Sequence, residues 1–244
     1  MNKKALTIPA IVIFSLLALY SCAFTPLREY FATDYVLNET VWFAIIDLVW
    51  MHLDIIATVA LLTFVIFGVY RYQLKGSKKV LLVTVGALLF KYIAAIIAFS
   101  IEYGSLDLTG GLTGFLVNLL IELALIALTV FLAHRYITPR RMIYEIKKEA
   151  AKKLDCDFEE KPIYPLQKIF SFKNPIQRII FIDITMIALF KILADIPDTF
   201  RYGIFDASYL LVAAFSWFIL ILIPAIYSYF LALLFFKICN KHAR

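Results

Sequence analysis

The chain alternates between long apolar stretches and short polar ones. Six stretches are dominated by aliphatic and aromatic side chains: 6–24, 41–70, 80–101, 111–134, 176–196 and 208–238. Several exceed the run of about 18 apolar residues that marks a helix long enough to cross a bilayer. A water-soluble fold would need several fully buried helices in one small domain. We therefore predict an all-α, polytopic membrane protein whose six transmembrane helices form three antiparallel hairpins within a single domain, 1–244.

The polar stretches predict where these helices end. Residues 25–40 are polar and acidic and predict a loop, and 71–79 predict a short basic turn. Asn174-Pro175 is a typical helix start, because an Asn cap and a proline in the first turn both suit a helix N-terminus. Proline lacks a backbone N–H, so we expect the fifth helix to stop or kink near Pro197, before a polar turn at 198–206, and the sixth to bend at Pro224.

Composition supports the same class. The 244 residues are 63% hydrophobic and 17% charged, whereas a soluble domain is about 45–50% apolar and about 25% charged. The basic start at Lys3 and Lys4 also resembles a signal peptide, but the apolar run after it is long enough to span, which favours a retained helix. The three cysteines lie far apart at 22, 156 and 239, which excludes a disulfide framework and the usual zinc spacings.

The positive charges predict the orientation. The N-terminal end, the 71–79 turn, the loop from 135 to 178 and the C-terminal end hold two, four, eleven and three Lys or Arg residues, against two in the opposite loops. This bias places both termini in the cytoplasm, which we expect to be that of a bacterial cell with the protein in its plasma membrane. It also explains the net charge of +6 without nucleic acid.

Residues 136–178 form the one sizeable segment outside the predicted spans. Met142, Ile143, Ile146, Ala150 and Leu154 form an apolar stripe at helical spacing among basic residues. This pattern predicts either an amphipathic helix at the cytoplasmic membrane surface, with some affinity for anionic lipid headgroups, or a solvated continuation of the fourth helix. Other membrane subunits are further candidate partners.

The third and fourth helices each carry one charge near their middle. Lys91 lies about 16 Å below the outer end of its helix, and Glu122 lies at a similar depth, at a rise of about 1.5 Å per residue. An ionisable side chain at this depth is costly unless it is paired or hydrated. We therefore expect Lys91 and Glu122 to form an ion pair across the hairpin.

Further ionisable side chains lie at membrane depth on the second and fifth helices: Asp47, His52, Asp54, Asp183, Lys191 and Asp195. Asp47 and Asp54 are two turns apart and face the same way, His52 lies on a different face, and Lys191 has the spacing to pair with Asp195. Two lysines cannot neutralise five acids, so some acids must be protonated, hydrated or near the outer interface. Individually such residues serve as interhelical glue, but the set favours a polar path.

Two hairpins share a short pattern. Leu89-Phe90-Lys91 recurs as Leu189-Phe190-Lys191, and Tyr103-Gly104 recurs as Tyr202-Gly203. This suggests a parallel internal repeat of the kind found in transporters, although apolar sequences also repeat short patterns by chance.

The chain has no nucleotide-binding glycine loop, no metalloprotease or serine-hydrolase motif and no His–Cys cluster, so we expect no enzyme activity, cofactor or metal. The leading prediction is a small transporter or the membrane subunit of a transport system. Its intramembrane polar path for a substrate or protons would comprise Asp54, Lys91, Glu122 and Lys191, with Asp47, His52, Asp183 and Asp195. The alternative is a scaffold, an assembly or immunity factor, or a sensor that acts through its cytoplasmic loop.

Overall fold

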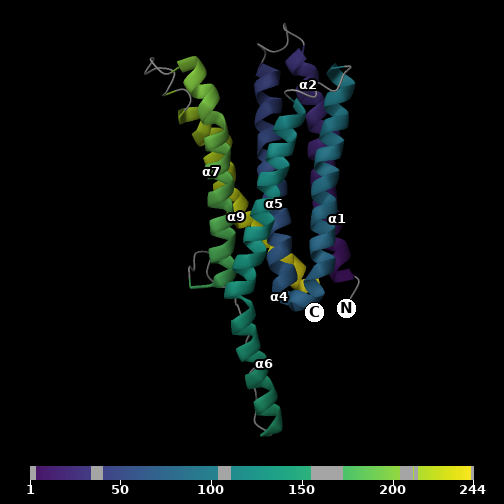
Figure 1. Cartoon of the computed structure of the whole chain (residues 1–244), viewed down its shortest axis with the longest axis vertical. Coiled ribbons are helices and arrows are strands. Elements are labelled where there is room, and N and C mark those ends of the chain that lie inside the picture. The colour runs from purple at the N-terminus through teal and green to yellow at the C-terminus, as the bar shows by residue number, and fades with distance from the viewer. Residues whose placement is uncertain are drawn as a thin grey trace.

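The computed structural model describes residues 4–33, 41–103, 111–154, 173–203, 211 and 214–242. Within these ranges the backbone is helical apart from short turns, which confirms the all-α class. The elements are α1 (Lys4–Ala18), η1 (Leu19–Phe24), α2 (Thr25–Thr33), α4 (Val41–Tyr103), α5 (Gly111–Tyr136), α6 (Thr138–Lys153), α7 (Pro175–Gly203), η2 (Phe218–Leu222) and α9 (Ile223–His242). They form an elongated bundle (Figure 1).

The predicted second and third helices form one continuous run of helical backbone, α4, which folds back on itself. Its first arm (41–71) and second arm (78–103) lie side by side, because the Lys91 ammonium on the second arm reaches Asp54 and Thr58 on the first. The chain therefore reverses direction between the two arms, at the turn predicted at 71–79, and the backbone of this turn is itself helical. Close to this reversal, Gly68 lies directly against Val80.

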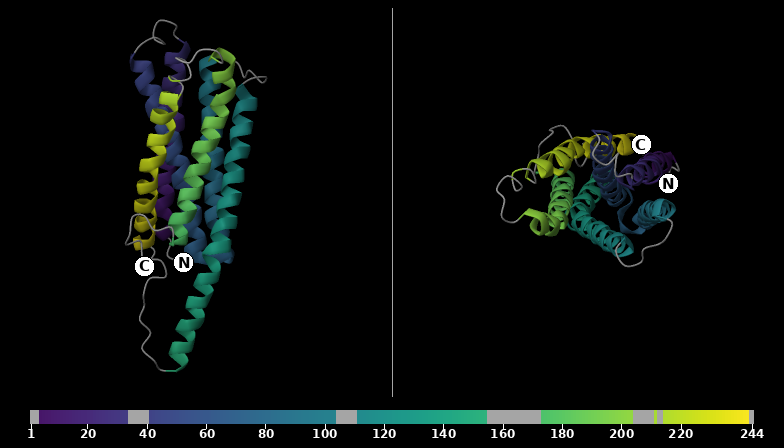
Figure 2. Two further views of the ribbon diagram at one scale, coloured as in Figure 1. Left: turned by 90° about the vertical axis from the view of Figure 1, so that its left-hand side faces the viewer. Right: turned by 90° about the horizontal axis from the view of Figure 1, so that it is seen from above.

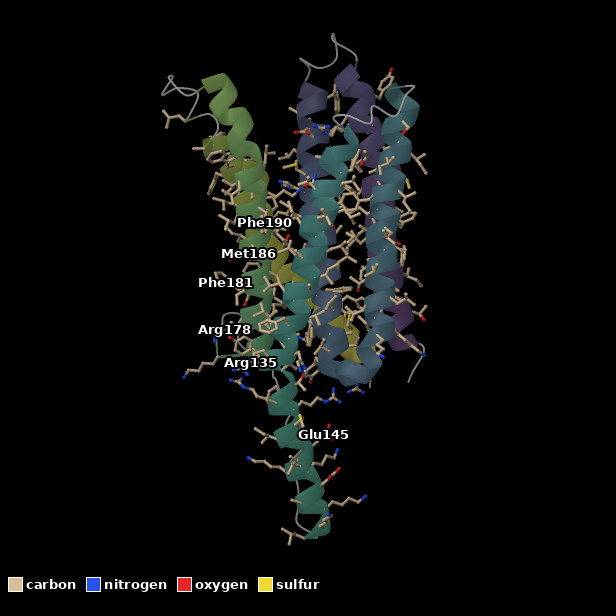
Figure 3. The ribbon with its side chains drawn as sticks, in the orientation of Figure 1. Arg135, Glu145, Arg178, Phe181, Met186 and Phe190 are labelled. Carbon is tan, nitrogen blue, oxygen red and sulfur yellow. The ribbon has the colours of Figure 1, made fainter. Side chains whose placement is uncertain are left out.

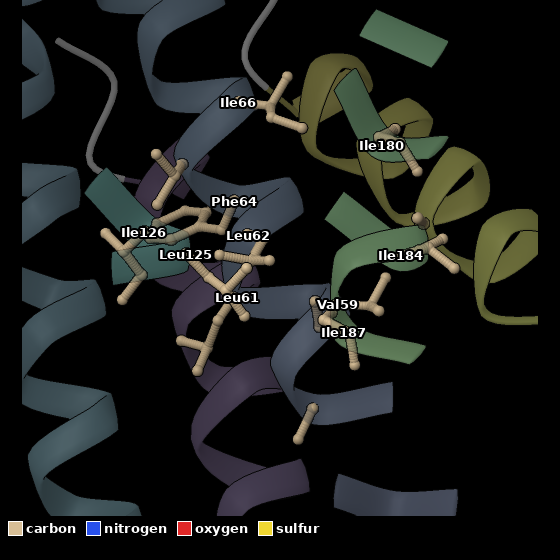
Figure 4. Packing of buried hydrophobic residues seen from close by; sticks show 14 of the residues in the cluster. Val59, Leu61, Leu62, Phe64, Ile66, Leu125, Ile126, Ile180, Ile184 and Ile187 are labelled. Carbon is tan, nitrogen blue, oxygen red and sulfur yellow. The ribbon is translucent and has the colours of Figure 1, made fainter. Parts of the chain in front are cut away.

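The first arm is the central helix of the bundle. In an 18-residue stretch within Ala44–Arg71, 83% of the residues are buried, against at most 39% in the corresponding stretches of the other long apolar helices. Residues 57–69 are buried on every side, as expected for a helix that is apolar all round. Figure 4 shows Val59, Phe64 and neighbouring first-arm residues packed with Leu125 of α5 and Ile184 of α7.

The outer surface of the bundle is apolar. Large hydrophobic side chains such as Leu82, Leu120, Phe131 and Ile226 are exposed on three different helical stretches, whereas Asp54 and Lys91 are buried inside. A soluble monomer rarely exposes so much contiguous apolar surface. This distribution of exposed apolar and buried charged side chains is compatible with a multi-pass membrane protein.

Five helical stretches are long and apolar enough to cross a membrane: Thr7–Arg28, Ala44–Arg71, Lys78–Ala98, Gly114–Lys153 and Ala214–Asn240. The remaining predicted span, the fifth (176–196), corresponds to α7, which lies alongside them but is less apolar (Figure 2). Asn174 caps α7 as predicted, since its Oδ1 accepts a hydrogen bond from the Ile176 amide at 3.0 Å. Of the two outcomes predicted near Pro197, a stop or a kink, the stop is wrong, because α7 continues to Gly203.

Two π-helical segments each end two residues before a proline. The ring of Pro26 or Pro224 would clash with a carbonyl in the preceding turn and offers no N–H to it. In the π register, carbonyls bond one residue further along: the Thr25 amide donates to Tyr20 O and the Ile223 amide to Phe218 O. The first helix therefore continues into α2, and the loop predicted at 25–40 is wrong over residues 25–33.

Helix α6 continues α5 beyond the end of the bundle where both chain termini lie (Figures 1 and 2). Helical backbone hydrogen bonds run through the junction, from the Ile137 amide to Ala133 O and from the Arg141 amide to Ile137 O. Arg135 and Arg178 lie where the bundle ends, and Glu145 lies further out on α6 (Figure 3). α6 has no buried residue, in keeping with the solvated continuation considered above.

The close approach of the two arms of α4 at Gly68 can be tested by adding one methyl group. A Cβ at Gly68 would lie 2.6–2.9 Å from three side-chain atoms of Val80, so one arm would have to shift. We expect Gly68→Ala to destabilise the protein by about 1–3 kcal/mol, the usual cost of overpacking. Thermal unfolding in lipid nanodiscs, followed by tryptophan fluorescence, measures the effect.

Gly86 provides the matched control, since a Cβ there meets nothing within 4 Å. Gly86→Ala should be neutral or stabilise by up to about 1 kcal/mol through helix propensity. Val80→Ala should restore much of the stability lost in Gly68→Ala. Equal effects of the two glycine substitutions would contradict this packing.

Candidate functional site

A buried ion network lies where the two arms of α4 meet α5. The Lys91 ammonium lies 2.6 Å from Asp54 Oδ1 and 2.6 Å from Glu122 Oε1. The Asp54 and Lys91 side chains are each 3% exposed, and that of Glu122 is 12% exposed. The ion pair expected between Lys91 and Glu122 is therefore present, and Asp54 joins it.

Lys191 completes the network from α7. Its ammonium forms an ion pair and a hydrogen bond with Asp54 Oδ2, so the two oxygens of one carboxylate bind two different lysines. The Asp195 side chain lies outside the described residues, so the pairing predicted between Lys191 and Asp195 stays a prediction. Asp54, Lys91, Glu122 and Lys191, hereafter the charge cluster, carry two negative and two positive charges.

The two lysines of the cluster occupy corresponding places in the recurring Leu-Phe-Lys triplet. Lys91 approaches Asp54 from the second arm of α4 and Lys191 approaches it from α7. Each occurrence of the triplet thus supplies one lysine to the Asp54 carboxylate on the central helix, so the two occurrences have the same structural role.

Polar and aromatic groups surround Lys91. Its ammonium lies 5.2 Å from the ring centre of Tyr20 and 5.4 Å from that of Tyr92, within the range of cation–π attraction. Ser21 Oγ donates to the Lys91 carbonyl at 3.1 Å, and Thr58 Oγ1 lies 3.4 Å from Glu122 Oε1. The π-helical segment η1 supplies both Tyr20 and Ser21, so the irregular turn before Pro26 contributes directly to the site.

The charge cluster borders a cavity of about 130 Å³. All four of its members line this cavity, together with Tyr20, Trp50, Thr58, Tyr92, Asn118 and several apolar side chains. Ligand pockets for drug-sized molecules are about 300–1,000 Å³, so this cavity suits water, an inorganic ion or a solute of a few heavy atoms.

A second ion pair lies nearer the α2 end of the bundle. Arg28 Nε donates to Asp47 Oδ1 at 2.7 Å, and the Arg28 guanidinium stacks 4.6 Å above the Trp50 ring. Trp50 also donates to Thr25 Oγ1 at 3.0 Å and stacks on Tyr20, with 5.5 Å between ring centres. Sequence reasoning placed Arg28 in a loop and missed this partner, although the seven-residue spacing of Asp47 and Asp54 already put both on one face.

Two predicted path residues lie outside the cluster. His52 faces η2 and α9: its Nε2 lies 3.4 Å from Ile219 O and its ring 5.7 Å from that of Tyr227, in keeping with the different face expected for it. Asp183 is buried between α7 and α5, where it is hydrogen-bonded to Thr129 at 3.0 Å. The structure therefore brings four of the eight candidates together and distributes Asp47, His52 and Asp183 among separate contacts.

Among the described residues, no group of three His, Cys, Asp or Glu side chains is arranged to hold a metal ion. The chain matches no protein-family model, no curated protein and no solved structure. The chemistry of the buried charges is thus the basis on which a function can be inferred.

The pairing in the charge cluster predicts an order of stabilities. Asp54→Asn removes the carboxylate from two ammonium groups, and breaking a buried pair usually costs about 3–5 kcal/mol. Glu122→Gln should lower the stability by less, because Lys91 remains paired with Asp54. Asp47→Asn, at a pair whose side chains are 27–28% exposed, should cost less than about 1 kcal/mol. Thermal unfolding in nanodiscs should rank the midpoints accordingly, and a larger loss for Glu122→Gln than for Asp54→Asn would contradict the geometry.

Proposed function

We propose that the protein is a small multi-pass membrane transporter, or the membrane subunit of a transport system, whose charge cluster binds a small polar or cationic solute. The observation that carries this proposal is the placement of two carboxylates and two lysines around a cavity inside an otherwise apolar bundle. Ionisable groups at this depth are expensive and usually mark ion or substrate paths. Helix packing alone could use uncharged hydrogen-bonding residues at lower cost.

The cluster suggests how a cation could be accommodated. Glu122 is the more exposed of the two carboxylates, and Asp54 can hold both lysines without it. A cationic solute that binds Glu122 would take the place of Lys91 there, and Lys91 would remain paired with Asp54. The two lysines compensate the charge of the two carboxylates while the site is empty, in a path with alternating or gated access to the two sides of the membrane.

The orientation we propose follows from the basic residues. Both termini and α6 lie at the same end of the bundle (Figure 1), and that end carries most of the Lys and Arg residues. The positive-inside rule then favours a cytoplasmic location for this end, with Arg28 and Asp47 towards the opposite side. We propose a bacterial plasma membrane as the location.

Transport can be tested with methylammonium as a small cationic probe. Proteoliposomes with the wild-type protein should take up radiolabelled methylammonium faster than empty liposomes, and Glu122→Gln should reduce the rate at least tenfold because the entering cation loses its carboxylate. Glu145→Gln, at an exposed site on α6, is the matched control and should leave uptake unchanged. Uptake no faster than in empty liposomes, or equal uptake by both variants, would contradict the proposal.

The second candidate is a scaffold or sensor, and helix α6 favours it. α6 projects from the bundle with no buried residue and exposes Met142, Ile143 and Ile146 beside its basic side chains. Such a helix offers a surface for a partner protein or for anionic lipid headgroups.

A loop replacement distinguishes the two candidates. In a transporter, a Gly/Ser linker in place of residues 138–173 should preserve methylammonium uptake. A scaffold should instead tolerate Glu122→Gln and lose its function with the linker, as measured by complementation of a deletion strain. Complementation by the linker variant but not by Glu122→Gln would exclude the scaffold.

A further inference from the structure

Asp183 is the buried carboxyl group that the charge cluster does not use. It lies on α7, 2% exposed, eight residues before Lys191. Its partner Thr129 lies on α5, seven residues after Glu122. At about 1.5 Å per residue, the Thr129–Asp183 pair lies about 10–12 Å from the cluster, towards the α6 end of the bundle.

The hydrogen bonds of Thr129 indicate which group carries the proton. Thr129 Oγ1 lies 2.8 Å from Leu125 O, four residues earlier, and 3.0 Å from Asp183 Oδ1. Four other hydroxyls of this protein donate to the carbonyl four residues earlier, at 2.7–2.9 Å: Thr63, Thr84, Ser100 and Thr185. A hydroxyl has one proton, so if Thr129 follows this pattern it can only accept from Asp183, which must then be protonated.

The surroundings of Asp183 support the same assignment. Among the described side chains, Thr129 is the polar group bonded to it, and the second carboxyl oxygen, Oδ2, has no hydrogen-bond partner. Burying an isolated carboxylate costs a large amount of free energy. Burying the carbonyl oxygen of a neutral carboxylic acid without a hydrogen-bond partner costs far less.

The titratable groups on the helices packed against α7 are engaged elsewhere. Asp54 and Lys91 of α4 and Glu122 of α5 are bound to one another. On α9, the Tyr227 ring contacts His52 and the Tyr229 ring contacts Phe230. On α7 itself, Lys191 binds Asp54. No ion pair with Asp183 occurs among the described side chains.

We propose that Asp183, with Thr129 as hydrogen-bond acceptor, is a proton-binding site of the protein, separate from the ionised charge cluster. Asp183 holds the proton as a neutral carboxylic acid in this conformation and transfers it to water when water reaches the α5–α7 interface, which leaves a carboxylate and a hydronium ion. The coupling of this proton to solute movement rests on the proposed transport function, but the site itself does not.

Infrared spectroscopy of the full chain in lipid nanodiscs tests the site directly. The carbonyl of a neutral carboxylic acid absorbs at a frequency where carboxylates do not. At pH 7, aspartate labelled with ¹³C at its carboxyl carbon should show this band, deuterium oxide should shift it, and Asp183→Asn should abolish it. Asp47→Asn, in which the lost carboxyl is paired with Arg28, is the matched control and should leave the band unchanged.

A second variant covers the case in which Asp183→Asn does not fold. Thr129→Val removes the acceptor, so the band should persist at a higher frequency, whereas Thr129→Ser should restore the wild-type position. Absence of the acid band in the folded wild type, or its persistence in folded Asp183→Asn, overturns the proposal. Because this readout needs no solute, a failure of methylammonium uptake would leave it intact.

Discussion

The structure depends on the neutralisation of one carboxylate on its central helix. Asp54 lies on the first arm of α4, is almost fully buried, and binds Lys91 through one oxygen and Lys191 through the other. Charges in a low-dielectric interior are tolerated only when such partners are held in place. The second arm of α4 and α7 are thereby tied to the central helix at one level, and α5 joins them through Glu122.

The two π-helical segments that precede Pro26 and Pro224 also supply polar contacts inside the bundle. Pro26 imposes the π register of η1, which presents Tyr20 and Ser21 to Lys91 and lets the helix continue to Arg28. Pro224 follows η2, whose Ile219 carbonyl faces His52. π-helical turns are often found at functional sites. The contacts that η1 and η2 make with the two sides of the central helix therefore agree with a functional role for the interior of the bundle.

The helical class, most of the apolar helices and the Lys91–Glu122 pair could be predicted, because hydrophobic run length and axial depth are properties of sequence alone. The contact between Lys191 and Asp54 could not, since it depends on how α7 rotates and packs against the central helix. A local pattern also misled, because polarity suggested a loop over residues 25–33, which are helical.

The charge balance has an electrical consequence. The six ionised groups from Arg28–Asp47 to the charge cluster sum to zero, and a protonated Asp183 adds nothing. If these six groups move together, they carry no net charge through the membrane field, and the field does no net work on them. An unbalanced charge, whether a bound cation or the carboxylate left by proton loss, would couple the same movement to voltage at about 2.3 kcal/mol per 100 mV if it crossed the whole field.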